Sequence, residues 1–110
     1  MEPNRSTKEI SLLQEIDTPA VIVDLKIVKE NINTYQKYCN EVGITLRPHI
    51  KTHKIPALAK LQVRAGAVGI TAQKISEAEA MISEGGIDDV LITYNIIGEQ
   101  KLKALLHLSN

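Results

Sequence analysis

LRPHIKTHK, residues 46–54, holds five basic side chains and one proline, although the formal net charge of the whole chain is zero. A short, mainly apolar run at 44–46 precedes it, and a helical pattern follows Pro56. This order predicts a strand, a loop and a helix, with the basic cluster at the carboxyl end of the strand. In α/β folds, ligands bind at that end of the strands.

The two faces of this predicted strand differ in character. Side chains alternate between the faces of a strand, so a strand that continues through Lys51 places Arg47, His49 and Lys51 on one face. Leu46, Pro48 and Ile50 then occupy the other face. Basic groups on one face are unusual for a simple core strand, and the pattern predicts a strand that lines a cavity.

The sequence RPHIKTHK resembles the cofactor-lysine motif of the D-threonine aldolase and eukaryotic-type D-serine dehydratase family, which are pyridoxal-phosphate enzymes of the alanine racemase fold. In that family, the lysine after Pro-His-x forms the Schiff base, and it corresponds to Lys51. The resemblance makes Lys51 the catalytic residue, and Arg47 and His49 are expected to contact the cofactor with it. It extends from about residue 16 to about residue 108 through weaker matches: DTPA (17–20), VDL (23–25), NI (31–32), GAVG (66–69), EAEA (77–80) and DDVLI (88–92).

Composition limits the classes of function that fit the chain. With 13 basic and 13 acidic side chains, it has no basic field that would hold nucleic acid or an anionic membrane. No apolar stretch approaches the ~20 residues of a membrane span, and the amino terminus lacks the apolar run of a signal peptide. The single Cys39 cannot form an internal disulfide, which suits a reducing compartment. We therefore expect a cytoplasmic protein that binds neither nucleic acid nor membrane.

The hydrophobic pattern alternates between strands and helices, as is typical of a parallel sheet. Asp24 precedes one helix as an N-cap, although it could instead be an active-site carboxylate. Cys39 is expected in the core rather than as a nucleophile. Ser76 and Glu79 have the spacing of a capping box. The pattern predicts strands at 20–23, 44–51, 67–71 and 90–94, and helices at 7–13, 25–39, 56–65, 76–84 and 98–108, the second burying Leu25, Val28, Ile32, Tyr35 and Cys39.

The length of 110 residues conflicts with a complete barrel, because a (β/α)8 barrel typically needs about 250 residues. We therefore expect an α/β chain with a partial TIM-type barrel of the alanine racemase amino-terminal kind. Residues 1–15 are predicted to be an N-terminal extension, and residues 16–110 the amino-terminal part of the pyridoxal-phosphate-binding domain. The resemblance implies that the strand at 20–23 belongs to a separate β domain. On this interpretation, the chain is an inactive amino-terminal fragment.

The resemblance also implies a reaction. The substrate would be a D-3-hydroxy amino acid, cleaved by a retro-aldol reaction to glycine and an aldehyde. D-serine dehydratase is the alternative in the same family, and the residues up to Asn110 do not separate the two. A racemase of this fold fits less well, because its typical lysine segment differs. A divalent metal, Mn, Mg or Zn, is implied only in the full-length parent, with ligands beyond Asn110.

A lysine forms a Schiff base only when its amine is neutral part of the time, and burial and nearby positive charge favour the neutral form. Arg47, His49 and Lys54 are candidate sources of that charge. Lys51 and Lys54 could instead be solvated loop lysines, and Lys54 is the rival attachment point. The His49 and His53 pair lacks the glutamate of a zinc-protease helix, so no metal site is predicted here.

Two further features leave alternatives open. Gln73, Tyr94 and Asn95 fall at or just past predicted strand ends, where they could line a site or form loop hydrogen bonds. An open parallel sheet leaves unpaired backbone groups and apolar surface, so a homo-oligomer is expected. The alternative from another functional class is therefore a non-catalytic half-barrel that pairs with another copy or with a partner chain.

Overall fold

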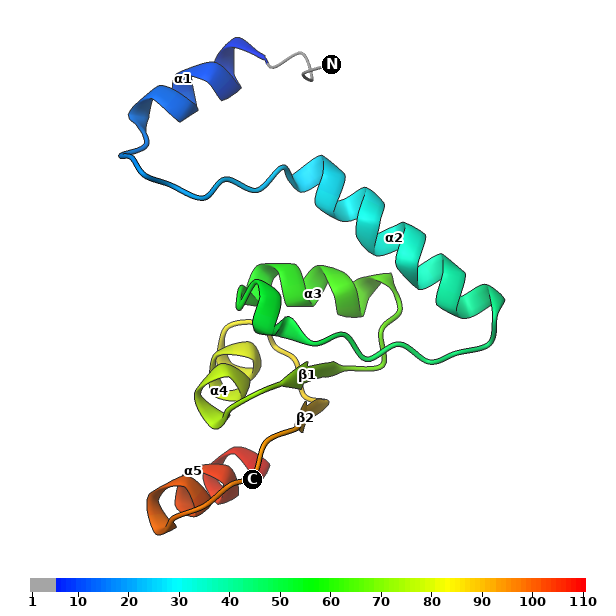
Figure 1. The fold of residues 1–110 in the computed structure, drawn as a ribbon, viewed down its shortest axis with the longest axis vertical. Helices are drawn as coiled ribbons and strands as arrows, with labels where there is room; N and C mark the ends of the chain where they lie inside the picture. Colours follow the sequence, from blue (N-terminus) through cyan, green and yellow to red (C-terminus); the bar gives the residue numbers. More distant parts are fainter. Residues whose placement is uncertain (1–5) are drawn as a thin grey trace.

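A computed structural model describes residues 6–110, so residues 1–5 of the predicted N-terminal extension lie outside the described residues (Figure 1). The described part of the chain alternates helices with two short strands after an initial pair of helices. The elements are α1 (Thr7–Glu15), α2 (Leu25–Glu41), the 3-10 turn η1 (Ile50–Thr52), α3 (Pro56–Ala65), β1 (Ile70–Ala72), α4 (Ile75–Ser83), β2 (Val90–Ile92) and α5 (Glu99–Ser109).

β1 and β2 form a parallel sheet in which Ile70 lies opposite Val90. The segment 44–49 runs along β1: the Thr71 N–H donates to the Pro48 carbonyl at 2.8 Å, and a parallel bridge joins His49 to Thr71. The predicted α/β order and parallel pairing are therefore confirmed. Within residues 6–110 the strands do not close into a barrel.

The core is small and lies where α3 and α4 pack beside β1 (Figure 1). Its largest fully buried side chains are Ile50, Ile70 and Met81. Ala59, Ala72 and Ala78 belong to the same cluster. Because alanine allows helices and strands to approach closely, this core holds η1, β1 and α4 tightly together.

The predicted helix ends are largely confirmed. The Asp24 carboxylate accepts the N–H groups of Lys26 and Ile27 at 3.1 and 3.3 Å, so Asp24 is an N-cap. Pro56 occupies the first turn of α3, and Gly66 follows its last residue with a φ of 128°. The short first helix also forms, as α1.

The capping box predicted at Ser76 and Glu79 does not form. α4 begins one residue earlier, after Lys74, and its N-cap makes no side-chain hydrogen bond. The backbone N–H of Gln73 instead donates to the Glu77 carboxylate at 2.9 Å. The spacing was misleading because α4 begins before Ser76, which therefore lies inside the helix and not at its N-cap.

Two predicted strands are wrong in these residues. Residues 20–23 are extended, but Val21 is 97% exposed and no neighbouring strand within residues 6–110 offers hydrogen bonds. The strand predicted at 44–51 is reduced to an isolated bridge at His49, after which the chain turns into η1, so Lys51 lies on a turn and the alternation of faces does not reach it.

The buried stripe predicted for α2 is only partly correct. Cys39 is buried, but Leu25 and Tyr35 are 49% and 62% exposed, and Gln36 is buried instead. The Gln36 amide nitrogen donates to Asn40 Oδ1 at 2.9 Å along the same helix, whereas its Oε1 is buried without a hydrogen-bond partner among residues 6–110. The apolar pattern alone therefore placed the packed face of α2 slightly wrongly.

The chain is extended for its size. Its radius of gyration is 17.1 Å, whereas a compact domain of 100 residues has a radius of about 13 Å. α1 and the segment 16–24 stand away from the core (Figure 1), and large apolar side chains such as Val21, Ile97 and Leu106 are exposed. No helix among residues 6–110 has the length and apolar character needed to cross a membrane.

A substitution at Gly69 tests how closely the chain before β1 approaches the chain before β2. A Cβ added there would lie 2.3 Å from the Asp89 carbonyl oxygen, so Gly69→Ala should destabilise the chain by about 1–3 kcal/mol through overpacking. Urea unfolding followed by circular dichroism measures this loss. The neighbouring Val68→Ala, at an exposed position, is the control and should change stability by less than about 0.5 kcal/mol. Equal effects of the two variants would contradict the close approach.

Candidate functional site

The lysine turn, residues 50–54, is held by hydrogen bonds from its own backbone. The N–H groups of His53 and Lys54 both donate to the Ile50 carbonyl, at 3.2 and 2.8 Å. The His49 ring closes the start of the turn, because its Nδ1 accepts the Lys51 N–H at 3.2 Å. With Ile50 fully buried between them, His49 and Lys51 are fixed beside the carboxyl half of β1.

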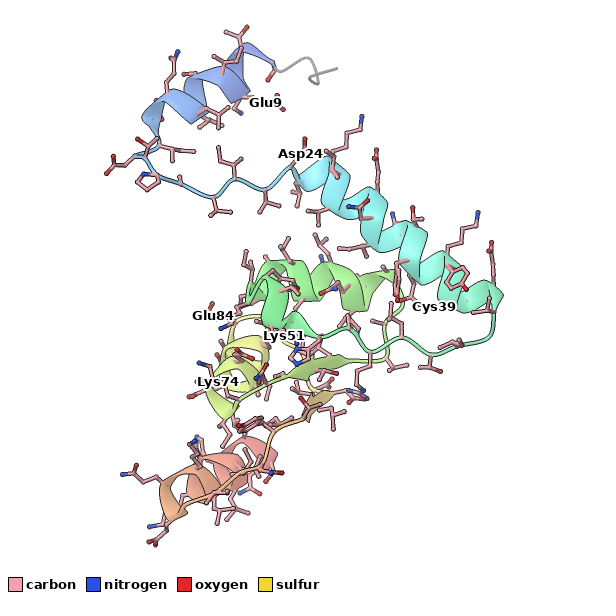
Figure 2. All side chains as sticks on the ribbon, viewed as in Figure 1. Glu9, Asp24, Cys39, Lys51, Lys74 and Glu84 are labelled. Carbon is pink, nitrogen blue, oxygen red and sulfur yellow. The ribbon has the colours of Figure 1, made fainter. Side chains whose placement is uncertain are left out.

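Lys51 is exposed on this turn, where the chain passes into α3 (Figure 2). The expected cavity around it is not formed by residues 6–110, and no carboxylate in this part of the chain pairs with its ammonium within 4 Å. A cofactor aldehyde needs an accessible amine that is not engaged by an acid. Lys51 meets both conditions, but the burial expected around its amine is absent within residues 6–110.

Arg47 lies at the opposite end of the sheet from Lys51. Its guanidinium is 2.8 Å from an Asp89 carboxylate oxygen and donates to the Ile70 carbonyl at 3.2 Å. Ile70 begins β1 and Asp89 directly precedes β2, so these bonds lie at the amino-terminal ends of the strands. The contact is not evident from the sequence, because Asp89 is 42 residues away.

Arg47 and His49 do share a groove, on the side that faces α2. The groove has a volume of about 550 Å³ and is bordered by Gln36 and Gln62 as well as by these two residues. Lys51 does not line it. The structure therefore brings Arg47 and His49 together along one surface and places Lys51 beyond its end.

His53 stabilises the end of the lysine turn. Its Nδ1 accepts the Ile55 N–H at 2.9 Å, and its Nε2 lies 3.0 Å from the Gln62 amide oxygen. Both ring nitrogens are thus engaged, which explains the histidine without a metal. In the part of the chain that the structure describes, no three His, Cys, Asp or Glu side chains gather as a metal site.

Lys54 is tied to the start of α4. Its ammonium lies 3.4 Å from the Glu77 carboxylate, and only 7% of that side chain is exposed. Burial raises the pKa of Glu77, but the Gln73 N–H and the Lys54 and Lys74 ammonium groups outweigh it and hold the pKa below its ordinary value of 4.5. In the sequence, Glu77 appears only within the weak EAEA match at 77–80, so nothing there indicates this ion pair.

The residues predicted to follow the strands lie at the same carboxyl edge. Gln73 comes directly after β1 and is exposed, with its backbone bonded to Glu77. Tyr94 and Asn95 follow β2 and are exposed too. The Thr93 N–H donates to the Ala72 carbonyl at 3.2 Å, which keeps the two strand ends adjacent.

The chain is similar to several known enzymes, although no protein-family model matches it. It is 37% identical over 97 residues to a D-threonine aldolase from an Arthrobacter species, a match that covers 88% of this chain and 25% of that enzyme. It is 41% identical over 95 residues to 3-hydroxy-D-aspartate aldolase from Paracoccus denitrificans, which covers 86% of this chain and 24% of that enzyme.

Solved structures agree with these relatives. D-threonine aldolase from Filomicrobium marinum is 44% identical and superimposes with a TM-score of 0.82, over 88% of this chain and 26% of that one. Over the matched residues, the chain is therefore similar to enzymes of the D-threonine aldolase type. It spans about a quarter of the length of the relatives it matches. A D-threo-3-hydroxyaspartate dehydratase in its metal-free form also matches, at 36% identity and a TM-score of 0.77, over 87% of this chain and 25% of that one.

Because the pKa of Glu77 is lowered in the folded chain, the free energy of unfolding depends on pH in the acidic range. A carboxylate whose pKa is lower in the folded state contributes stability above its unfolded pKa, and this contribution is lost as the pH falls through the folded pKa. Unfolding midpoints in urea should therefore fall as the pH is lowered below 4.5, and Glu77→Gln should reduce this decline. Glu79→Gln, an exposed change on the same helix, should retain the wild-type pH profile. An unchanged profile in Glu77→Gln would contradict the assignment.

Proposed function

We propose that this chain is part of a pyridoxal-phosphate-dependent lyase that cleaves D-3-hydroxy amino acids, in the manner of a D-threonine aldolase. The observation that supports the proposal most is the accessible Lys51, free of an acidic partner within residues 6–110, beside the carboxyl end of β1. Aldolases that act on D-threonine and on 3-hydroxy-D-aspartate are among its relatives. Residues 16–110 would form part of the cofactor domain, with residues 1–15 as an extension.

In this proposal Lys51 holds the cofactor through its ε-amine. The bond from its backbone N–H to His49 and the burial of Ile50 keep the lysine turn in place while the side chain reaches outward. Pyridoxal phosphate, when bound, accepts the electrons that bond cleavage leaves on the α-carbon of an amino acid. His49 is the neighbour best placed to contact it, because its Nδ1 is used by the turn while Nε2 has no partner within residues 6–110.

A role for Arg47 at the cofactor stays a prediction. Its bonds to Asp89 and Ile70 favour a structural role at the other end of the sheet. The described residues offer no metal site, so the divalent metal implied by the family resemblance, Mn, Mg or Zn, enters no step proposed for them.

Elimination of water is the second candidate reaction. D-serine dehydratase from Schizosaccharomyces pombe is 30% identical over 102 residues, covering 88% of this chain and 24% of that enzyme. Cleavage and elimination both begin with an amino acid bound to the same cofactor, so Lys51 would serve either. Assay with D-threonine and with D-serine separates the two reactions when the chain is part of an active enzyme.

A cytoplasmic location is supported by the free, buried Cys39.

Cofactor trapping tests the role of Lys51. After incubation with pyridoxal phosphate and reduction with borohydride, peptide mass spectrometry should find Lys51 labelled about tenfold above the mean of the other lysines, a selectivity of about 1.4 kcal/mol. Lys51→Arg should abolish the selective signal. Lys60→Arg, an exposed change on α3, should leave it intact. Even labelling of all lysines would contradict the proposal and favour the alternative of a non-catalytic half-barrel.

Exposed apolar surface supports the proposal that copies of the chain associate. Val21, Ile97 and Leu106 are 97%, 78% and 65% exposed, more than a stable monomer of this size usually leaves open. Size-exclusion chromatography with light scattering should therefore give a mass above the 12.1 kDa of one chain, and the isolated chain should show no lyase activity. A folded monomer in this measurement would be evidence against association.

A further inference from the structure

Glu77 is a buried charged side chain for which the proposed reaction gives no role. Only 7% of it is exposed, and it is the one buried side chain with a formal charge among residues 6–110. A carboxylate is buried at a large cost in free energy unless it is paired and hydrogen-bonded. The partners of Glu77 therefore indicate what its burial achieves.

Both partners of Glu77 belong to the candidate site. One carboxylate oxygen lies 3.4 Å from the Lys54 ammonium, three residues after Lys51. The other accepts the backbone N–H of Gln73, the first residue beyond β1, at 2.9 Å. One side chain on α4 thus connects the lysine turn to the carboxyl end of β1.

The backbone at Lys54 is in a conformation that needs such support. Its φ of 56° lies in the left-handed region, which a residue with a Cβ rarely adopts. Lys54 is the one non-glycine residue with positive φ within the described chain. Its N–H donates to the Ile50 carbonyl, and its ammonium pairs with Glu77. The turn is therefore held by both the backbone and the side chain of Lys54.

We propose that Glu77 is a positioning residue that fixes the lysine turn relative to β1 by holding Lys54 and Gln73 at once, and so determines where the Lys51 amine is presented. This inference rests on the proposed role of Lys51 as the cofactor attachment point. It also gives Lys54 a definite role. The Lys54 ammonium is engaged by Glu77, which makes this residue a support for Lys51 rather than a rival.

The test combines cofactor trapping with amide hydrogen exchange on the whole chain. Glu77→Gln keeps the shape of the side chain and removes its charge, and Glu79→Gln removes a charge from the exposed face of the same helix. Gly69→Ala serves as a variant destabilised at the opposite end of the sheet. Lys54→Arg keeps the ion pair, whereas Lys54→Met removes it.

Glu77→Gln and Lys54→Met are expected to speed exchange of the Lys54 and Gln73 amides about tenfold, as loss of a charge-assisted bond would, and to reduce selective labelling of Lys51. Lys54→Arg, which keeps the ion pair, should retain the wild-type exchange rates and the selective labelling of Lys51. Glu79→Gln and Gly69→Ala should retain the selectivity of labelling, which separates positioning from general loss of stability.

The failures of the two proposals are distinguishable. Selective labelling of Lys51 that persists in Glu77→Gln would overturn the inference and leave the proposed function standing. If the wild-type chain shows no selective labelling, the proposed role of Lys51 fails. Amide hydrogen exchange alone then tests whether Glu77 holds Lys54 and Gln73. Faster exchange at Lys54 and Gln73 would support the hold exerted by Glu77, and unchanged exchange would overturn it.

Discussion

Burial of Ile50 is the interaction on which the arrangement of the site depends. Its side chain is fully buried in the cluster that also contains Ile70 and Met81, and burial of an isoleucine contributes about 1.5–3 kcal/mol. Because its neighbours in the chain are His49 and Lys51, burial of Ile50 leaves them at the rim of the core. Its carbonyl also accepts the two N–H groups that close the lysine turn. One residue thus joins hydrophobic packing to the placement of Lys51, the candidate attachment point.

Much of the local structure could be predicted because its signals are short-range. Asp24 before an apolar periodic stretch, Pro56 at a helix start and Gly66 at a helix end each act on the nearest turn of backbone. The parallel order of β1 and β2 followed from helices of suitable length between apolar runs. None of these inferences required knowledge of distant residues.

The predictions that failed depend on partners or on competing bonds. Residues 20–23 have the composition of a strand but no neighbouring strand within residues 6–110, and pairing cannot be read from one strand alone. The extended segment that ends at His49 was predicted to be a strand that continues through Lys51. It stops because the His49 ring accepts the Lys51 N–H and the chain turns, and a period of two contains no information on such a bond.

The cavity that the strand pattern predicted around Lys51 is not formed by residues 6–110, where Lys51 is exposed. The identity of Lys51 as the candidate lysine came from the motif and not from its surroundings. Glu77, in contrast, is identified by its surroundings and not by a motif. Its burial and its link to Lys54 arise only when α4 packs beside the lysine turn, so nothing in the sequence near Glu77 points to them.

The motif RPHIKTHK divides its basic residues between two roles along one segment. Arg47 is bonded at the amino-terminal ends of the strands, where contacts in α/β barrels serve stability, whereas Lys51 lies at the carboxyl edge, where these folds place their chemistry. His49 lies between them and shapes the turn. A change at Arg47 should therefore act through Asp89 and the spacing of β1 and β2, while a change at Lys51 removes the amine itself. Basic residues adjacent in sequence need not share a function, because a few residues of extended chain carry them from one end of a sheet to the other.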